Sequence, residues 1–210
     1  MACCRPRCTI CLLSVAFIFI VAIVCSYIFL FLVPYENIKF HVRDASLTQF
    51  NLTSDDDTLH YHLAVNITVR NTNKKIGVRY DNITSTANCY GKDFGLVSLT
   101  PFRQGHKNTT LLRAVFQGNT SLRLQGSQLM DFTNDQRNGN YSIFLKLDGL
   151  LMLKYHGGGS GSNIQWNYNV RCGLLRLPLS LANSSTDQAV YPRLFNKRRC
   201  KLSYYLGVII

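Results

Sequence analysis

An uncharged apolar run near the N-terminus constrains this chain more than any other feature. From Ile10 to Val33 the sequence holds 24 residues without a charge, most of them Ile, Leu, Val and Phe. A helix of that length spans about 36 Å, whereas the hydrocarbon core of a bilayer is about 30 Å thick. A cleaved signal peptide has a shorter apolar region and ends at small residues, which Tyr35-Glu36-Asn37 does not resemble. The run therefore predicts an uncleaved transmembrane helix.

N-glycosylation acceptors predict the side of the membrane on which the rest of the chain lies. Flanking charge does not decide it, because Arg5 and Arg7 before the run are matched by Lys39 and Arg43 after it. Every N-x-S/T triplet, by contrast, follows the run. The triplets begin at Asn51, Asn66, Asn82, Asn108, Asn119, Asn140 and Asn183. We therefore expect a cytosolic N-terminal tail and an extracytoplasmic C-terminal region.

The chain divides accordingly into a tail at residues 1–9, a helix at 10–33, one domain at 34–203 and an apolar end at 204–210. The part after the helix is long enough for one domain with a core. It carries 21 of the 23 Lys and Arg residues against 11 acidic ones, a net charge of +10. Part of this charge is a basic cluster near the C-terminus, Lys197, Arg198, Arg199 and Lys201. A basic surface favours acidic partners, and an extracytoplasmic position excludes nucleic acid.

The cysteines fall into two groups. Membrane-adjacent thiols are typical sites of S-acylation, with inert thiols and a zinc site as alternatives; the acylation candidates are Cys3, Cys4 and Cys8, followed by Cys11 at the edge of the helix. Beyond the membrane lie Cys89, Cys172 and Cys200, an odd number in an oxidising compartment. One of these three is therefore a buried free thiol or an intermolecular link.

Alternating apolar residues predict an all-β domain. The longest alternation runs from Leu59 to Val69, with His60, His62 and other polar residues on the opposite face. Shorter alternations or β-favouring compositions predict further strands at Ile38–Phe50, Gly77–Tyr90, Thr109–Gln117, Tyr141–Leu147, Ile164–Val170 and Leu174–Leu181. A helical period appears only weakly, at Ser127–Phe132. About seven strands with turn signals between them favour an antiparallel, fibronectin-III-like β-sandwich.

The sequence contains no convincing catalytic, cofactor or metal motif. His60 and His62 share a strand face beside Asp55, Asp56 and Asp57, but a solvated face next to an acidic loop explains them better than a metal site. The glycine-rich stretch from Gly157 to Ser162 lacks the residues of a phosphate-binding loop or a nucleophile elbow. We expect no cofactor, no metal and no enzymatic activity.

Four segments resemble a known plant family. The stretch N-T-N-K-K-I-G-V-R-Y-D from Asn71 to Asp81 resembles the N-P-N-K-x-I-G-I-Y-Y-D segment of harpin-induced-like and non-race-specific-disease-resistance-like proteins, which carry a late-embryogenesis-abundant group two domain. Segments at Leu99–Thr110, Phe116–Gly118 and Val170–Leu179 resemble further family segments in the same order. The matching motif residues are Asn71, Asn73, Lys74, Ile76, Gly77, Tyr80 and Asp81.

The resemblance implies a short cytosolic tail, one membrane helix and an external β-sandwich at the plasma membrane, including plasmodesmata. It also implies a disulfide between Cys172 and Cys200 and a role in defence and stress responses. The partner we expect is an acidic cell-wall polysaccharide or another membrane protein. The alternative function is a lipid-binding or lipid-handling sandwich tethered at a membrane.

Overall fold

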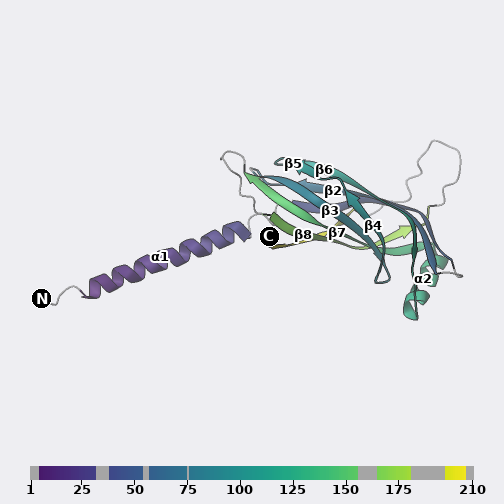
Figure 1. Ribbon diagram of the computed structural model, residues 1–210, viewed down its shortest axis with the longest axis horizontal. Helices are drawn as coiled ribbons and strands as arrows, with labels where there is room; N and C mark the ends of the chain where they lie inside the picture. Colours follow the sequence, from purple (N-terminus) through teal and green to yellow (C-terminus); the bar gives the residue numbers. More distant parts are fainter. Residues whose placement is uncertain are drawn as a thin grey trace. The chain divides into compact units, whose positions relative to one another are not determined.

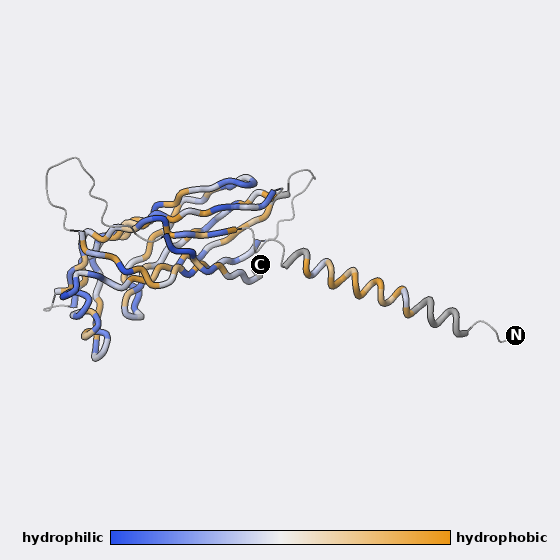
Figure 2. The backbone as a smooth tube through the Cα atoms, turned by 180° about the vertical axis from the view of Figure 1, so that it is seen from behind, coloured by the Kyte–Doolittle hydropathy of each residue, from blue (hydrophilic) through white to orange (hydrophobic). Residues whose placement is uncertain are grey.

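The computed structural model describes residues 5–31, 38–53, 57–74, 76–155, 165–180 and 197–206. These residues form two separate units, divided after Ile38. The first unit contains helix α1 (Arg5–Phe31), whose middle is apolar (Figure 2). Side chains of α1 are described at positions 13–28. Among the described residues, no helix has the length and apolar character that a membrane crossing requires.

The second unit is built from two antiparallel sheets with one short helix at one end (Figure 1). The strands are β1 (Ile38–Leu52), β2 (Thr58–Asn71), β3 (Ile76–Cys89), β4 (Lys92–Leu99), β5 (Phe102–Gln104), β6 (Thr109–Ser121), β7 (Asn140–Tyr155), β8 (Gln165–Pro178), β9 (Arg198–Arg199) and β10 (Lys201–Leu206). The helix is α2 (Ser127–Asn138). The predicted all-β, antiparallel sandwich is therefore confirmed for this unit.

One sheet has the strand order β6-β2-β1-β9 and the other β10-β8-β7-β3-β4, with β5 also paired to β3. In β2, buried and half-buried residues alternate from Thr58 to Val69, as the sequence pattern predicts. Between the sheets, aromatic rings from both sides meet: Phe40 of β1 stacks on Tyr168 of β8 with ring centroids 6.0 Å apart. The core is thus made by the inward-facing halves of both sheets.

The structure differs from the sequence expectations in three places. The prediction of a separate strand at Leu174–Leu181 is wrong, because β8 runs without a break through Gly173 to Pro178. The weak helical period at Ser127–Phe132 belongs to a longer helix, α2, which ends at an αL glycine, Gly139. Strands β4, β5, β9 and β10 were not expected, and β10 pairs residues 204–206 of the predicted apolar end with β8.

Candidate functional site

Basic side chains from the beginning and the end of the domain's sequence gather on the outer face of the four-stranded sheet. On β1 the inward residues Ile38, Phe40 and Val42 are buried, so the residues between and after them face outward. The short strand β9 pairs with β1 and places Arg199 directly opposite His41. We define the cationic cluster as Lys39, His41 and Arg43 of β1 together with Lys197 and Arg199.

The cluster is rich in uncompensated positive charge. No ion pair joins its members to a carboxylate among the residues that the structure describes. Burial and the nearby charges of Lys197, Arg199 and Lys39 lower the pKa of His41 below its ordinary value of 6.5. Because like charges held close together repel one another, this arrangement works against folding stability. A surface on which positive charges repel one another in this way is suited to an anionic ligand.

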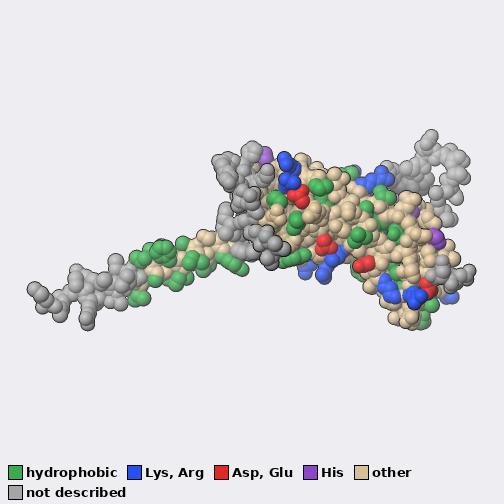
Figure 3. Space-filling view, viewed as in Figure 1, with side chains coloured by type: hydrophobic (Ala, Val, Ile, Leu, Met, Phe, Trp, Pro, Cys, Tyr) green, Lys and Arg blue, Asp and Glu red, His purple; other side chains and the backbone are tan. Residues whose placement is uncertain are grey.

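The six-stranded sheet differs from this cluster, because some of its basic residues form ion pairs. Two of its outward basic residues have acidic neighbours: Arg79 lies 2.8 Å from Asp81, and Lys146 lies 3.0 Å from Asp148. Figure 3 shows acidic side chains close to basic side chains at several places on the face drawn there. Positive charge is therefore partly compensated on the six-stranded sheet, whereas no member of the cationic cluster has an ion pair among the residues that the structure describes.

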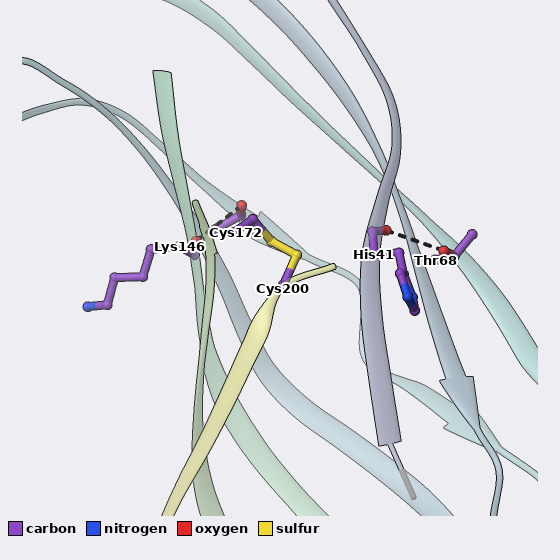
Figure 4. Close-up of a disulfide and its surroundings, with 6 residues drawn as sticks. His41, Thr68, Lys146, Cys172 and Cys200 are labelled. Atoms are coloured by element: carbon purple, nitrogen blue, oxygen red, sulfur yellow. Dashed lines mark hydrogen bonds between the residues drawn. A yellow bond between two sulfur atoms is a disulfide. The ribbon is translucent and has the colours of Figure 1, made fainter. Parts of the chain in front are cut away.

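A disulfide holds the cluster together. Cys172 of β8 and Cys200 are joined with an S–S distance of 1.99 Å, the pair that the family resemblance implies (Figure 4). Cys200 lies between β9, which belongs to the four-stranded sheet, and β10, which belongs to the six-stranded sheet. Its backbone N–H also donates to Phe40 O at 2.9 Å. The cross-link therefore fixes the crossover segment that carries Arg199 and Lys197.

The family motif forms a buried hydrogen-bond network in the β2–β3 turn. The Asn71 side chain is fully buried, and its Nδ2 donates to Ile76 O at 2.8 Å and to Gly105 O at 3.0 Å. Its Oδ1 accepts from the backbone N–H of Asn73 at 3.0 Å and from Asn73 Nδ2 at 2.9 Å. This network ties the β2–β3 turn to the loop after β5.

The other motif residues also serve the fold. Tyr80 is fully buried and donates from its hydroxyl to Gln104 Oε1 at 3.4 Å, while Gln104 Nε2 donates to Val69 O at 2.8 Å. Sequence reasoning missed Gln104, which becomes recognisable only when β5 is paired with β3. Ile76 is buried, Asp81 pairs with Arg79, and Lys74 and Gly77 are placed by the turn and by β3.

Most glycosylation acceptors lie on exposed backbone. Exposed positions are occupied by Asn51, Asn82, Asn108, Asn119 and Asn140. Asn82 has a left-handed backbone (φ 50°) at a bulge in β3. Asn66 is half-buried, and its Nδ2 donates to Asp44 Oδ2 at 2.8 Å. Asn183 lies outside the described residues.

Within the described ranges, the remaining predicted residues form no assembled reactive site. Cys89 is a fully buried free thiol whose pKa burial raises to about 12, so it stays protonated. His62 hydrogen-bonds through Nδ1 to the Thr48 hydroxyl. In the described part of the chain, no three His, Cys, Asp or Glu side chains are placed to hold a metal. Cys3, Cys4, Asp55, Asp56 and the stretch 157–162 lie outside the described residues, as do the side chains of Cys8 and Cys11.

Comparison with known proteins gives consistent matches. The family model of the late embryogenesis abundant protein matches residues 66–159. NDR1/HIN1-like protein 10 of Arabidopsis thaliana is 40% identical over 88% of this chain and 83% of that protein. NDR1/HIN1-like proteins 2 and 3 of the same plant are each 34% identical, and the matches cover 60% and 65% of their lengths. A solved structure from Archaeoglobus fulgidus aligns at a TM-score of 0.31 and 11% identity over 67% of this chain and 98% of that one, a likeness too low to add to the fold described above.

Proposed function

We propose a function from one premise: this chain belongs to the NDR1/HIN1-like family of late embryogenesis abundant proteins. It is a plant protein of defence and stress responses whose β-sandwich acts as a binding module outside the cell, at the plasma membrane and cell wall, and not as an enzyme. The buried motif has a structural role in this module, because Asn71, Asn73 and Gln104 use their polar groups to hold turns and strands together.

The proposed membrane anchor is α1. Four consecutive residues, Phe17, Ile18, Phe19 and Ile20, are each between 59% and 68% exposed. Consecutive residues point to all sides of a helix, about 100° apart, so this stretch is apolar around its whole circumference. An apolar environment would suit such a stretch, which supports the proposal, and the 27 residues of α1 extend over about 40 Å. The acceptor triplets, all beyond α1, support an extracellular domain and a cytosolic tail.

The proposed ligand is an acidic cell-wall polysaccharide, bound at the cationic cluster. The observation that carries this proposal is the concentration of Lys39, Lys197 and Arg199 around His41 without a described carboxylate partner. A polymer with repeated carboxylates neutralises several of these charges at once. Each contact relieves repulsion within the cluster as well as adding attraction.

The test is retention of the full chain, in detergent micelles, on immobilised polygalacturonate. We expect retention at low salt that falls as the Debye length shortens from about 30 Å at 0.01 M to about 8 Å at 0.15 M. The triple variant Lys39→Gln, Lys197→Gln, Arg199→Gln should lose most of it.

A matched control removes the same net charge elsewhere. Arg103→Gln, Lys107→Gln and Arg171→Gln neutralise three exposed basic residues outside the cluster. Equal loss of retention in both triple variants would show that only net charge matters and would refute the cluster as the site. Binding that ignores salt would point instead to a contact with another membrane protein.

Sidedness is tested separately on intact cells. We expect a mobility shift after enzymatic removal of N-glycans, and protease sensitivity of the domain beyond α1. A domain that is protected from external protease and carries no glycan would overturn the membrane orientation and, with it, the polysaccharide ligand.

A further inference from the structure

A second surface, remote in sequence from the cationic cluster, forms a polar pocket where α2 meets the six-stranded sheet. Its volume is about 660 Å³, within the roughly 300–1,000 Å³ typical of small-molecule sites. The residues that line it come from α2, the start of β7 and the end of β8. They are Asn134, Asp135, Asn138, Asn140, Ser142 and Arg176.

The fold fixes the geometry of this pocket. Asp135 Oδ2 accepts from the Tyr90 hydroxyl at 2.9 Å and from the backbone N–H of Ser142 at 3.1 Å, which ties α2 to the sheet. Burial, and then the hydrogen bond to Asp135, raise the pKa of Tyr90 well above its usual value, so its hydroxyl remains a donor. The left-handed residue Gly139 (φ 63°) turns the chain from α2 directly into β7, where Asn140 Nδ2 donates to Asn138 O at 3.0 Å.

All six residues that line the pocket have side chains that can form hydrogen bonds. Three carboxamides and a hydroxyl supply both donors and acceptors, and the Asp135 carboxylate has about four acceptor sites, of which two are used. Arg176 lies opposite Ser142 in the β7–β8 pairing and forms no ion pair within the described parts of the chain. Such a set matches a ligand with many hydroxyl groups and one anionic group.

An exposed aromatic residue lies on the same strand as Ser142 of the pocket lining. Phe144 follows Ser142 by two residues on β7, so both side chains point to the same outer face. Phe144 is 44% exposed, unlike its neighbours Ile143 and Leu145, which are buried. A pyranose ring has an apolar C–H face that packs on an aromatic ring, while its hydroxyl groups hydrogen-bond to amides and carboxylates.

We propose that this pocket binds one unit of an acidic saccharide, with Arg176 pairing with its carboxylate, the carboxamides contacting its hydroxyls and Phe144 covering its apolar face. The proposal takes its class of ligand from the proposed function, but it uses a separate surface. The cationic cluster attracts a polymer by charge alone, whereas the pocket distinguishes one sugar unit from another.

The experiment measures calorimetric binding of trigalacturonate, and of its uncharged analogue galactotriose, to the full chain in detergent micelles at fixed salt. The chain is produced once without N-glycans and once with them. We expect saturable binding of trigalacturonate and about tenfold weaker binding of galactotriose, because a charge-assisted contact to Arg176 is missing. Arg176→Gln should weaken the acidic ligand about tenfold and leave the neutral one unchanged, while Phe144→Ala should weaken both.

The control is Arg171→Gln, which removes an exposed arginine from the same strand outside the pocket. It should leave both affinities within about twofold, roughly 0.4 kcal/mol. Equal effects of Arg176→Gln and Arg171→Gln, or no saturable binding in any form, would overturn the proposal. A glycosylated chain that binds nothing, while its Asn140→Gln variant binds, would assign the pocket to the chain's own glycan and would also overturn it.

The cationic cluster and the pocket can be refuted independently of each other. If neutralising Lys39, Lys197 and Arg199 abolishes retention on the polymer but leaves the trigalacturonate affinity intact, the pocket is independent of the cluster. If Arg176→Gln has no effect on trigalacturonate while polymer retention persists, the pocket is refuted and the cationic cluster stands.

Discussion

Replacing Asn71 by alanine should strongly destabilise the domain. The Asn71 side chain is fully buried and makes four hydrogen bonds, to Ile76 O, Gly105 O, and the backbone and side-chain nitrogens of Asn73. Ile76 and Asn73 are themselves 7% and 6% exposed, so water cannot easily replace the lost partner there. Three such groups, Ile76 O and the two nitrogens of Asn73, lose their partner. At about 1–3 kcal/mol for each buried group, the free energy of unfolding should fall by at least about 3 kcal/mol.

The assay is urea unfolding followed by the fluorescence of Trp166, which is the single tryptophan of the chain and is 7% exposed. In thermal unfolding, 1 kcal/mol corresponds to about 2–4 °C for a domain of this size, so a loss of 3 kcal/mol should lower Tm by about 6–12 °C. The control Asn88→Ala removes an exposed hydrogen bond to Asp93 and should change stability by about 0.5 kcal/mol or less.

A second variant separates hydrogen bonding from packing. Asn71→Asp keeps the shape of the side chain but turns the donor Nδ2 into an oxygen that faces two carbonyl oxygens, those of Ile76 and Gly105. It should therefore destabilise the domain at least as much as Asn71→Ala. If Asn71→Asp is tolerated, or if Asn71→Ala costs less than about 1 kcal/mol, the motif does not act through this network and the reasoning is refuted.

Three further outcomes are expected from the same unfolding assay. Replacing Cys172 and Cys200 together by serine opens a cross-link between residues 28 apart and should cost roughly 3–4 kcal/mol, with no effect of reductant on the variant. Gly149→Ala should cost about 1–3 kcal/mol, because a Cβ there would lie 2.7 Å from the hydroxyl oxygen of the buried Tyr168; an unchanged midpoint would contradict this close contact. His41 has a lowered pKa when folded, so the unfolded chain takes up its proton first; stability should fall as pH drops from about 6.5 to that lowered pKa, and His41→Gln should make this pH dependence shallower.

The strand periodicity could be predicted from sequence because it is local. In β2, alternate residues from Leu59 to Val69 face the core, and a two-residue period of this kind is visible in any single sequence. The motif around Asn71 also identified the family, although nothing in the sequence shows that its asparagines are buried. Strand β4 breaks this period, because its consecutive residues Phe94 and Gly95 are both buried at a register shift in its pairing with β3.

The binding surfaces required the tertiary structure. His41 and Arg199 are far apart in the chain, and only the antiparallel pairing of β1 with β9 makes them neighbours. The two-residue strand β9 has no periodicity to detect, and its position depends on the cross-link at Cys200. The polar pocket likewise depends on the turn at Gly139, which brings α2 back against β7.

What the sequence determines and what the tertiary structure decides differ in how far apart along the chain the interacting residues lie. Apolar alternation, the uncharged N-terminal run and the glycosylation triplets are read from neighbouring residues, so the sequence by itself determined the all-β class and the family. Which cations gather around His41, and which amides surround Arg176, depends on strand order and on contacts between distant segments. Those contacts form only when the two sheets bury their apolar faces against each other, so the tertiary structure alone decided where this protein presents its charge and its pocket.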